Sequence, residues 1–533
     1  MKKISILDCT LRDGGYVNDF KFGKETIIGF LNKIVDANIE CVELGFLKGE
    51  IYNPDYTYYP DIDSIKTVLL NKCDKIKYFV MYDTSAPLDL EKIKKYDGTS
   101  IDGIRVIFKN DKIDEGYKAC KKFIELGYIV SANFVSTDVY TDNELKSHIE
   151  RFNELDLYTM VIVDTFGSIK KNKFMHIVEI FNKYMKSNIT LSYHAHNNLQ
   201  QAYLNAVSFV ELNLDRDILI DASVFGMGRG AGNLNIELFA EYLNETKNKN
   251  YHIVPILEIM DEYIQDIYKN KFWGYSLPLY ISGTLNVHPN YAIYLAEKNT
   301  LTEKSLYEVM NSISKNDRLK YKKDIAEKYY IDYMNNSIDD KVAIDELSSL
   351  LKGKKVFIIA PGKTINDYAD KILNVVNNEE YVSISLNFYN EKFMVDFIFS
   401  SNMRRYNRID GKIDYYKSLN SKLKTIITSN MREAINKDYM LNFYNLAVES
   451  KDIVDNAGIM VLKLLSRISV KEVLIAGMDG YNEKNPDVYS DETTYYDFSD
   501  EAEIRNKYIS LELNKLKNSI DIKFLTPTKY GCY

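Results

Sequence analysis

Length, composition and charge set the first limits on this protein. The chain has 533 residues, of which 46% are hydrophobic and 27% are charged, and its net charge is −8. A chain of this length exceeds what one hydrophobic core supports, so two or three domains are expected. The acidic balance argues against a dedicated nucleic-acid-binding protein, and no apolar run approaches the ~20 residues needed to span a bilayer.

The N-terminus and the cysteines indicate a compartment. A strand-like pattern begins within the first few residues, so no signal peptide is expected. The five cysteines are scattered and form no C-x-x-C pair, which is typical of reduced thiols in a cytosolic protein. We therefore expect a cytoplasmic protein. The cysteines are Cys9, Cys41, Cys73, Cys120 and Cys532.

Residues 1–245 alternate short apolar, β-branched segments with amphipathic ones. Continuous apolar strands that alternate with helices predict a parallel sheet covered on both faces. Eight such units in ~240 residues predict a (β/α)8 barrel, with a doubly wound open sheet as the alternative. The eight segments are KISILDCT (3–10), ECVELGF (40–46), KYFVMYD (77–83), GIRVIFK (103–109), YIVSANFV (128–135), YTMVIVDT (158–165), ITLSYHAH (189–196) and ILIDASVFG (218–226).

Two further regions follow the barrel. Residues 246–350 lack strand signals and carry helical patterns such as VPILEIMDEYIQDIYKN, so we expect a helical extension. At residue 355 the segment KVFIIAPGKTINDYADKI reads as a strand, a tight turn and a helix. Apolar segments at 394–401, 424–429 and 472–481 follow it, and together they predict a Rossmann-like α/β domain over 351–533.

The ends of the predicted strands carry the residues suited to chemistry, because barrel active sites lie at the C-terminal face. The first segment ends in Arg12 and Asp13, and the seventh carries His194 and His196. Side chains two residues apart on a strand point the same way, so the two imidazoles converge. Two histidines and one carboxylate leave open positions, as a catalytic metal site requires. An isolated H-x-H is more often a solvated pair, and Arg12 with Asp13 alone is more often a structural ion pair.

The glycine-rich segment GMGRGAGN follows the eighth predicted strand. It fits G-x-G-x-x-A through Gly226, Gly228 and Ala231, but a dinucleotide fingerprint belongs on the first βα unit. We instead expect the backbone at Gly228 and Gly230 to bind a carboxylate or phosphate of the substrate. Asn233 either caps the next helix or completes the metal shell.

Three motifs taken together resemble a known superfamily. LDCTLRDGG, HAHNN and GMGRGAGN, in this order, are similar to the metal-dependent aldolases and acyl lyases that include 4-hydroxy-2-oxovalerate aldolase, 3-hydroxy-3-methylglutaryl-CoA lyase and homocitrate synthase. The resemblance covers roughly residues 1–320. It implies that Asp13, His194 and His196 hold a divalent ion, Mn²⁺ first and Mg²⁺ or Zn²⁺ otherwise, with Asn233 as a fourth ligand.

The same resemblance implies the reaction and the substrate-binding residues. The reaction is aldol cleavage or condensation through a metal-bound, pyruvate-like enolate, with a 2-oxo acid and an aldehyde as substrates. Arg12 would stabilise the enolate. Thr165 would seat the carboxylate of the 2-oxo acid, and we also expect Arg105, on the fourth strand, to bind substrate.

The sequence departs from the family at the catalytic base. The hydroxy-oxovalerate aldolases have a histidine three residues after the aspartate, where this chain has Tyr16, and a phenol is a poor base at neutral pH. The lyase-type loop cysteine is also missing, since Arg229 lies inside the glycine loop. Tyr275, in WGYSLPLY, matches the aldolase segment that brings a catalytic tyrosine over the barrel mouth. His288, in NVHPNY, is another candidate for the base.

The C-terminal domain resembles the DUF115 and bacterial sialyltransferase-like Rossmann domains through IIAPGKTI, DFIFSSNMRR and VLIAGMDGY. This resemblance implies a nucleotide or nucleotide sugar near the turn at Pro361 and Gly362, where Lys363 could meet a phosphate. The leading hypothesis is a carbon–carbon lyase, set in surface polysaccharide or sugar-acid biosynthesis. The alternative is a nucleotide-sugar-dependent transferase whose barrel is a binding module. A 2-His-1-carboxylate iron oxygenase fits the barrel and Arg12 less well. A homodimer is expected, because barrels of this family often associate.

Overall fold

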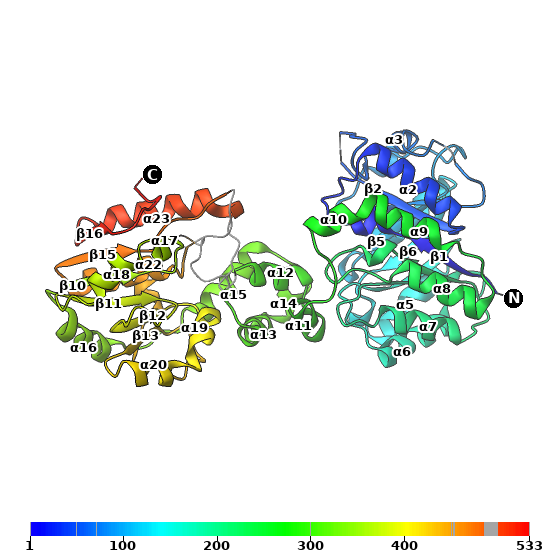
Figure 1. Ribbon diagram of the computed structural model, residues 1–533. Coiled ribbons are helices and arrows are strands. Elements are labelled where there is room, and N and C mark those ends of the chain that lie inside the picture. Colours follow the sequence, from blue (N-terminus) through cyan, green and yellow to red (C-terminus); the bar gives the residue numbers. More distant parts are fainter. Residues whose placement is uncertain are drawn as a thin grey trace. The chain divides into compact units, whose positions relative to one another are not determined.

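The structure is a computed structural model, and the chain divides into two compact units (Figure 1). Unit 1 comprises Met1–Ile293 and Lys315–Tyr321, and unit 2 comprises Tyr294–Ser314 and Lys322–Tyr533. The structure describes residues 2–49, 51–70, 72–298, 300–448, 450, 453–483 and 499–531. Cys532 lies outside these residues.

Unit 1 contains a closed parallel barrel. Its strands follow the order β1-β9-β8-β7-β6-β5-β4-β2, and the pairing of β1 with β2 closes the ring, while β3 adds to β2 outside it. The predicted (β/α)8 barrel is therefore confirmed, and the open sheet is excluded. The strands are β1 (Ile4–Asp8), β2 (Cys41–Leu47), β3 (Tyr58–Tyr59), β4 (Lys77–Asp83), β5 (Gly103–Phe108), β6 (Ile129–Phe134), β7 (Thr159–Asp164), β8 (Thr190–Ala195) and β9 (Ile218–Ala222).

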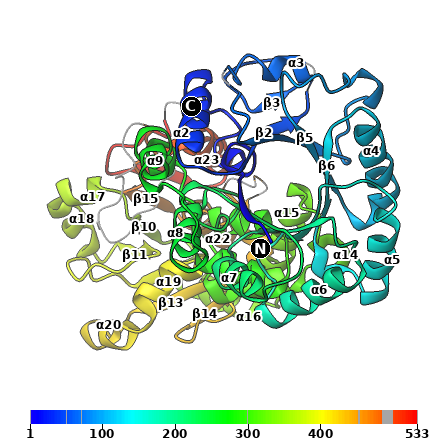
Figure 2. The same cartoon turned by 90° about the vertical axis from the view of Figure 1, so that its right-hand side faces the viewer.

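Helices cover the outside of the barrel, and Figure 2 shows α4, α5 and α6 along its outer side. Each helix turns one apolar face inward, as α4 does with Ala119, Cys120 and Phe123. α5 begins with a capping box at Thr141 and Glu144. The helices between and after the strands are α1 (Thr10–Asp13), α2 (Lys24–Asp36), α3 (Ile62–Ile65), α4 (Ile113–Glu125), α5 (Asp142–Phe152), α6 (Lys171–Tyr184), α7 (Ala202–Glu211) and α8 (Ile236–Lys247).

The two faces of the strands build two layers of core. Ile6 and Val42 belong to the large cluster that the strands share with the helices. Their chain neighbours Leu7 and Cys41 instead join Phe79 in a small cluster contributed by several strands. Because side chains alternate along a strand, this small cluster fills the barrel interior. The barrel is thus a packed core, and its chemistry is confined to the strand ends.

The region 246–350 is helical, as expected, and the two compact units divide it near residue 293. The segment 260–264 is a single π-helical turn (Met260–Ile264) between α9 and α10. The helices are α9 (Ile253–Ile259), α10 (Gln265–Asn270), α11 (Leu277–Leu285), α12 (Pro289–Glu297), α13 (Glu303–Ser312), α14 (Lys315–Arg318), α15 (Lys323–Met334) and α16 (Lys341–Leu351).

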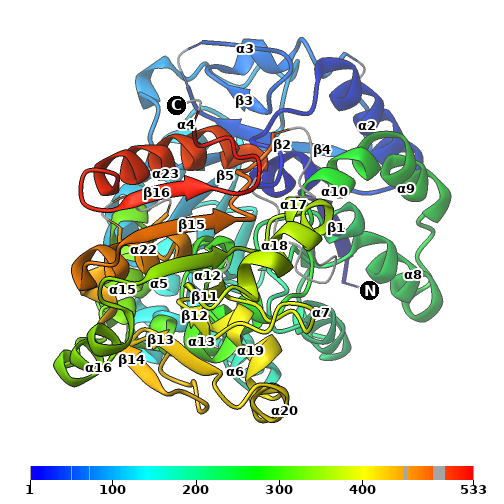
Figure 3. The same ribbon diagram turned by 60° about the vertical axis from the view of Figure 1, so that its left-hand side comes forward.

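Unit 2 contains a second parallel sheet, which bears out the predicted α/β domain. Its order is β14-β13-β12-β11-β10-β15-β16, and the run from β16 through β15 toward β14 can be followed in Figure 3. The chain builds outward from β10 to β14 and then returns to the other side of β10, so the order reverses between β10 and β15. The strands are β10 (Lys355–Ile359), β11 (Tyr381–Leu386), β12 (Phe397–Ser400), β13 (Lys424–Thr428), β14 (Tyr439–Leu441), β15 (Glu472–Ala476) and β16 (Asp521–Phe524).

The helices of unit 2 complete the α/β alternation. None of the helices that the structure describes, in either unit, combines the length and apolar character needed to cross a membrane. The helices of unit 2 that follow β10 are α17 (Thr364–Asp367), α18 (Ala369–Val376), α19 (Met403–Asp410), α20 (Ile413–Leu419), α21 (Phe443–Leu446), α22 (Ala457–Ile468) and α23 (Ala502–Leu516).

Candidate active site

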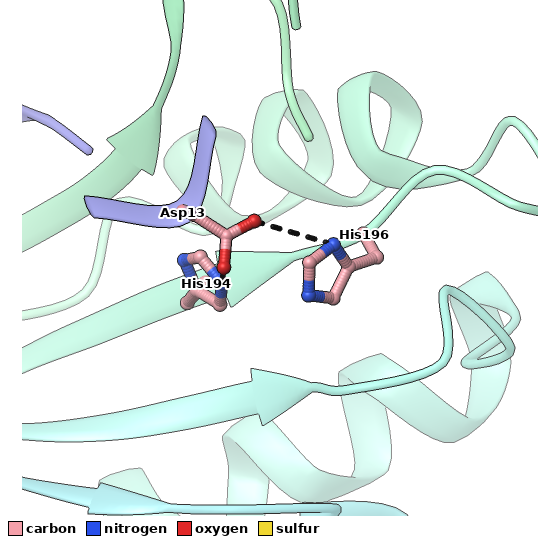
Figure 4. A group of neighbouring side chains, drawn as sticks. All are labelled: Asp13, His194 and His196. Atoms are coloured by element: carbon pink, nitrogen blue, oxygen red, sulfur yellow. Dashed lines mark ion pairs between the residues drawn. The ribbon is translucent and has the colours of Figure 1, made fainter. Parts of the chain in front are cut away.

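Asp13, His194 and His196 meet at the C-terminal end of the barrel (Figure 4). Asp13 ends the short helix α1 directly after β1, and His194 lies near the end of β8. The Asp13 carboxylate lies 4.0 Å from His194 Nε2 and 3.7 Å from His196 Nδ1. All three side chains are buried, while Ala195 turns into the core. The structure thus brings together the three residues that the sequence singles out as metal ligands.

The donor set fits a divalent cation. One ligand atom from each of the three residues can be chosen so that all lie within 4.8 Å of one another. Within the part of the chain that the structure describes, His196 Nδ1 and Asn233 Oδ1 are buried and have no hydrogen-bond partner. Buried polar atoms are normally satisfied, and a ligand bound at the cluster would satisfy these two. Imidazole nitrogen with carboxylate and amide oxygen is a usual donor set for divalent metals.

Asn233 lies against the cluster and not at a helix end. Its Nδ2 donates hydrogen bonds to Asp13 Oδ2 (2.9 Å) and to the Met227 carbonyl oxygen (3.2 Å). The residue at the N-cap of α8 is Asn235, so the capping alternative for Asn233 is wrong. The amide nitrogen of Asn233 therefore orients Asp13, and its buried oxygen has no hydrogen-bond partner among the described residues.

The glycines of the loop support the cluster and do not line the cavity above it, whereas Arg229 of the same loop does. A Cβ atom on Gly228 would lie 2.5 Å from Asn233 Nδ2 and 2.7 Å from Asp13 Oδ2. Gly230 has a positive φ of 66°, and the backbone N–H of Ala231, the next residue, donates to Asn198 Oδ1. Gly228 and Gly230, which the sequence assigned to substrate binding, instead allow the loop to pack on the ligands.

A buried chain of charges lies beneath the ligands. Arg12 Nε donates to Glu43 Oε2 (2.7 Å), and its Nη1 donates to Asp13 Oδ1 (2.5 Å). Arg105 then joins Glu43 Oε2 (3.1 Å) to Asp221 Oδ2 (2.6 Å), and Asp221 Oδ2 lies 3.0 Å from His194 Nδ1. The chain of charges fixes the ligands on both sides of the cluster.

Arg105 does not contact substrate, contrary to the expectation from the sequence. Its side chain is 0% exposed, lies in this charge chain and does not line the cavity. Its two carboxylate partners occupy the guanidinium edges, so Arg105 is a positioning residue. Asp221 was not singled out from the sequence. An acidic residue inside the apolar run ILIDAS is the signal that marks it.

Burial and electrostatic interactions with neighbouring groups hold Asp13 and His196 in the protonation states that bind metals. Burial acts to raise the pKa of Asp13, but the electrostatic interactions with His196, Arg12 and His194 outweigh it and hold this pKa below its ordinary value. Burial lowers the pKa of His196 to about 3. Asp13 is therefore ionised and His196 neutral at neutral pH, the states in which both residues bind metals.

A cavity of about 720 Å³ opens above the cluster. Of the residues assigned from the sequence, Arg12, Asp13, Tyr16, Thr165, His194, His196 and His288 line it. The Thr165 hydroxyl accepts a hydrogen bond from the Ser136 backbone N–H (2.8 Å). Tyr275 is 50% exposed and does not line the cavity, so the structure does not bring it to the barrel mouth.

His288 lines the cavity, and its imidazole is neutral at neutral pH. Burial, followed by the charges of Arg229 and Lys109, lowers the pKa of His288 to about 3. Its Nδ1 accepts a hydrogen bond from the Asn290 backbone N–H (3.2 Å), which assigns the ring proton to Nε2. The ring also stacks on Tyr321, with centroids 6.0 Å apart. His288 is thus a hydrogen-bond donor in this state and a weak proton acceptor.

Comparisons with known proteins concern the N-terminal part of the chain, which contains the barrel. The family model described as HMGL-like matches residues 109–261. A 4-hydroxy-2-oxovalerate aldolase from Carboxydothermus hydrogenoformans is 25% identical over 265 residues, which are 48% of this chain and 76% of the relative. An oxaloacetate decarboxylase from Mycobacterium tuberculosis is 22% identical over 242 residues, 44% of this chain and 67% of the relative. Among solved structures, the N-terminal domain of a provisionally assigned aldolase from Bacteroides vulgatus aligns with a TM-score of 0.47 at 24% identity, covering 55% of this chain and 96% of that chain.

The barrel and its site define the class: this protein is an enzyme of the carbon–carbon lyase type, built on a (β/α)8 barrel. Within that class, its N-terminal barrel is similar to the HMGL-like family and to 4-hydroxy-2-oxovalerate aldolases. The family depends on divalent metal ions, and Asp13, His194 and His196 form a cluster suited to holding one.

Proposed function

We propose that unit 1 forms or cleaves a carbon–carbon bond through the enolate of a pyruvate-like 2-oxo acid, with an aldehyde as the second substrate. The observation that carries this proposal is the buried Asp13–His194–His196 cluster at the closed end of a cavity, with Arg12 beside it. The similarity to an aldolase and a decarboxylase, both named for 2-oxo acid substrates, supports it.

Asp13, His194, His196 and the Asn233 amide oxygen would hold the ion, for which Mn²⁺ is our first choice and Mg²⁺ or Zn²⁺ the alternatives. When bound, such an ion supplies Lewis-acid polarisation of the keto oxygen. Arg12 has its Nε on Glu43 and one Nη on Asp13, so its remaining N–H edge can donate to a developing oxyanion. The Thr165 oxygen already accepts from Ser136, so its hydroxyl proton remains for a substrate carboxylate.

Two other groups in the cavity wall can move protons. His288 carries its proton on Nε2 and can donate to the oxygen of the aldehyde. Tyr16 also lines the cavity and, as a phenolate beside the Arg229 guanidinium, can take the proton from C3 of the 2-oxo acid. We therefore assign the base to Tyr16, at the position where related aldolases have histidine.

Exchange of the pyruvate methyl hydrogens with deuterium, followed by mass spectrometry, tests this proposal. With Mn²⁺ present we expect exchange in the wild type, and we expect Asp13→Asn and His194→Ala to lose both exchange and bound metal. Tyr16→Phe should lose about 10²-fold in exchange rate, the usual effect of removing a general base, while it retains the metal.

The exposed pair His176 and Asp142 on the outside of the barrel offers matched controls of the same residue types. His176→Ala and Asp142→Asn should bind metal and exchange as the wild type does. A wild-type protein that binds no divalent metal and exchanges no small 2-oxo acid would refute the proposal. Metal binding without exchange would instead favour a barrel that serves as a binding module.

For unit 2 we propose a nucleotide or nucleotide-sugar site at the reversal of strand order between β10 and β15. In open parallel sheets, ligands bind at the carboxyl ends of the strands at such a point. A cavity of about 140 Å³ lies there, and its lining includes Gly362 and Gly477 from the ends of the two strands, with Arg405 and Arg505. A Cβ on Gly362 would lie 2.2 Å from the Gly477 carbonyl oxygen, so only glycine lets the two loops meet. The turn residue Lys363 does not line this cavity.

Titration with CMP, UDP and GDP tests this second site. We expect Arg405→Gln to weaken binding about 10-fold, the scale of one lost charge-assisted hydrogen bond. Arg467→Gln, on the exposed last turn of α22, is the control. Binding equal in both variants would refute the site. The role in polysaccharide or sugar-acid synthesis and the homodimer stay predictions, and sedimentation equilibrium checks the homodimer.

A further inference from the structure

Three cationic side chains, Lys109, Arg229 and Lys315, line the cavity of unit 1 and have no carboxylate partner among the residues that the structure describes. Arg12 pairs with Asp13 and Glu43, and Lys320 pairs with Asp111. Among the residues that the structure describes, no carboxylate lies within 4.0 Å of the charged groups of Arg229 or Lys109, although both line the cavity. Both charges are therefore available to an anion that enters the cavity.

Arg229 is held in one orientation by an aromatic platform. Its guanidinium carbon lies 4.0 Å from the centroid of the Tyr16 ring. Edge-to-face contacts hold that ring against Phe20 (5.0 Å) and Phe46 (6.2 Å). Stacking covers the flat face of the guanidinium and leaves its N–H edge for hydrogen bonding, the arrangement suited to a carboxylate or phosphate.

Arg229 and Lys109 line the same cavity as the metal ligands. The backbone N–H of Arg229 lies 3.5 Å from Asp13 Oδ2, and its guanidinium stacks on Tyr16, which is 38% exposed, whereas Arg12, His194 and His196 are buried. The charges of Arg229 and Lys109 both act on His288, where they add to burial in lowering its pKa. Arg229, Lys109 and His288 all line this cavity.

The volume of the cavity leaves room for a second substrate beside a small 2-oxo acid. Cavities of ~300–1,000 Å³ hold ligands much larger than a three-carbon acid, and this one measures about 720 Å³. A 2-oxo acid bound at the buried ligands would thus leave the rest of the cavity, which Arg229 and Lys109 help to line, to the other reactant.

We propose that Arg229, together with Lys109, binds a carboxylate or phosphate group on the second substrate, so that the aldehyde used by this enzyme is an anionic one. The inference rests on the proposed lyase function and names its substrate class. In the condensation, C3 of the 2-oxo acid loses a proton and bonds to the aldehyde carbon, whose oxygen gains a proton. Nothing is oxidised or reduced in this step.

Paired aldehydes of equal length test the proposal. Succinic semialdehyde and butyraldehyde differ by a carboxylate in place of a methyl group, and glyceraldehyde 3-phosphate and glyceraldehyde differ by a phosphate. In the wild type with pyruvate and Mn²⁺ we expect kcat/KM to favour the anionic member of at least one pair. Which pair shows the preference identifies the anion as carboxylate or phosphate. Arg229→Gln should reduce that preference about 10- to 100-fold, and Arg229→Lys should reduce it less, because the charge remains.

Arg151 provides a matched control, because its guanidinium also stacks on a tyrosine, Tyr117, at 4.7 Å on the outside of the barrel. Arg151→Gln should leave the preference unchanged. If Arg229→Gln lowers kcat/KM equally for the anionic and the neutral aldehyde, the ratio of the two values stays the same. This result would overturn the inference, because Arg229 would then bind the 2-oxo acid. A wild type that prefers neutral aldehydes would overturn it as well.

A binding measurement separates this inference from the lyase proposal. Titration calorimetry with succinate and with inorganic phosphate requires no turnover. We expect Arg229→Gln to bind the preferred anion about 10-fold more weakly than the wild type and Arg151→Gln do. Equal affinities of the wild type and Arg229→Gln for the anion would overturn the inference, even if pyruvate exchange is normal. A lack of pyruvate exchange would refute the lyase proposal, but it would not affect the result of this binding measurement.

Discussion

Arg105 holds a full positive charge inside the barrel with no exposed surface. Burial raises the pKa of Asp221, but the charges of Arg105 and His194 outweigh this effect and hold that pKa below its ordinary value. One guanidinium therefore pairs with two buried carboxylates, those of Glu43 and Asp221, beneath the metal ligands. A residue that touches no substrate thus controls the geometry of those that do.

We expect Arg105→Met to destabilise the protein by about 3–5 kcal/mol, because Asp221 would lose its principal cation while still buried. Urea unfolding measures this change. Lys320→Met removes the cation of an exposed pair with Asp111 and should cost less than about 1 kcal/mol. Similar losses in the two variants would contradict a buried, coupled charge chain.

His288 should make stability depend on pH. Its pKa is about 3 when folded against 6.5 when unfolded, so between these values the unfolded chain binds a proton that the folded chain does not. Its contribution is fully present above pH 6.5 and is lost as the pH falls toward 3. When the pH falls from 7.5 to 5, the free energy of unfolding of the metal-free wild type should fall by more than that of metal-free His288→Gln. The difference, measured by urea unfolding, should be about 1–2 kcal/mol after allowance for solvent screening. An equal loss in both proteins would rule this out.

At the scale of elements, the site depends on a loop that packs against a strand end. The loop from Gly226 to Asn233 places backbone beside Asp13, and the short helix α1 turns Asp13 toward β8. Neither feature belongs to the regular barrel. The strands bring the ligands to one end, and these two irregular connections bring them within ligand distance.

Gly228→Ala should weaken Mn²⁺ binding about 10- to 100-fold, the range seen when the groups that orient metal ligands are disturbed. The added methyl group would press on Asn233 and Asp13 and cost about 1–3 kcal/mol of stability in addition. Gly411→Ala, at an open position with nothing within 4 Å, is the control for both measurements. Unchanged metal affinity in Gly228→Ala would show that the loop does not position the ligands.

The sequence pattern predicted most, but not all, of the strands. The barrel strands were predicted within one or two residues, except at the end of β9, because segments such as TMVIVD in β7 are apolar on both faces and uninterrupted. β11, with the sequence YVSISL, was not predicted, because Ser383 and Ser385 alternate with its apolar residues although both are buried. β16 is a short edge strand, DIKF, whose charges mask it.

At the scale of the whole molecule, the chain forms two units with separate cores. The large barrel core and the core around Phe357 and Ile398 share no residue. Independent cores commonly unfold independently. The metal site lies wholly in unit 1, and the cavity at the strand reversal lies wholly in unit 2.

Differential scanning calorimetry should therefore show two transitions, of which Mn²⁺ raises one. At 100 times its dissociation constant the ion stabilises unit 1 by about 2.7 kcal/mol, which corresponds to a rise of several degrees. Asp13→Asn should abolish the rise and leave the second transition in place. A single transition that Mn²⁺ moves as a whole would contradict this expectation.

The sequence by itself determined the alternation of strands and helices over residues 1–245, the second α/β region and the presence of Asp13, His194 and His196 at strand ends, because the alternation of apolar segments is a local property of the pattern. The closure of the first sheet into a barrel was decided by the pairing of β1 with β2. The tertiary structure alone decided that Arg105 is buried beneath the site, that Tyr275 lies outside the cavity and that Arg229 stacks on Tyr16. Those relations join residues far apart in the chain. They depend on how connections pack in space, which the periodicity of a sequence does not encode.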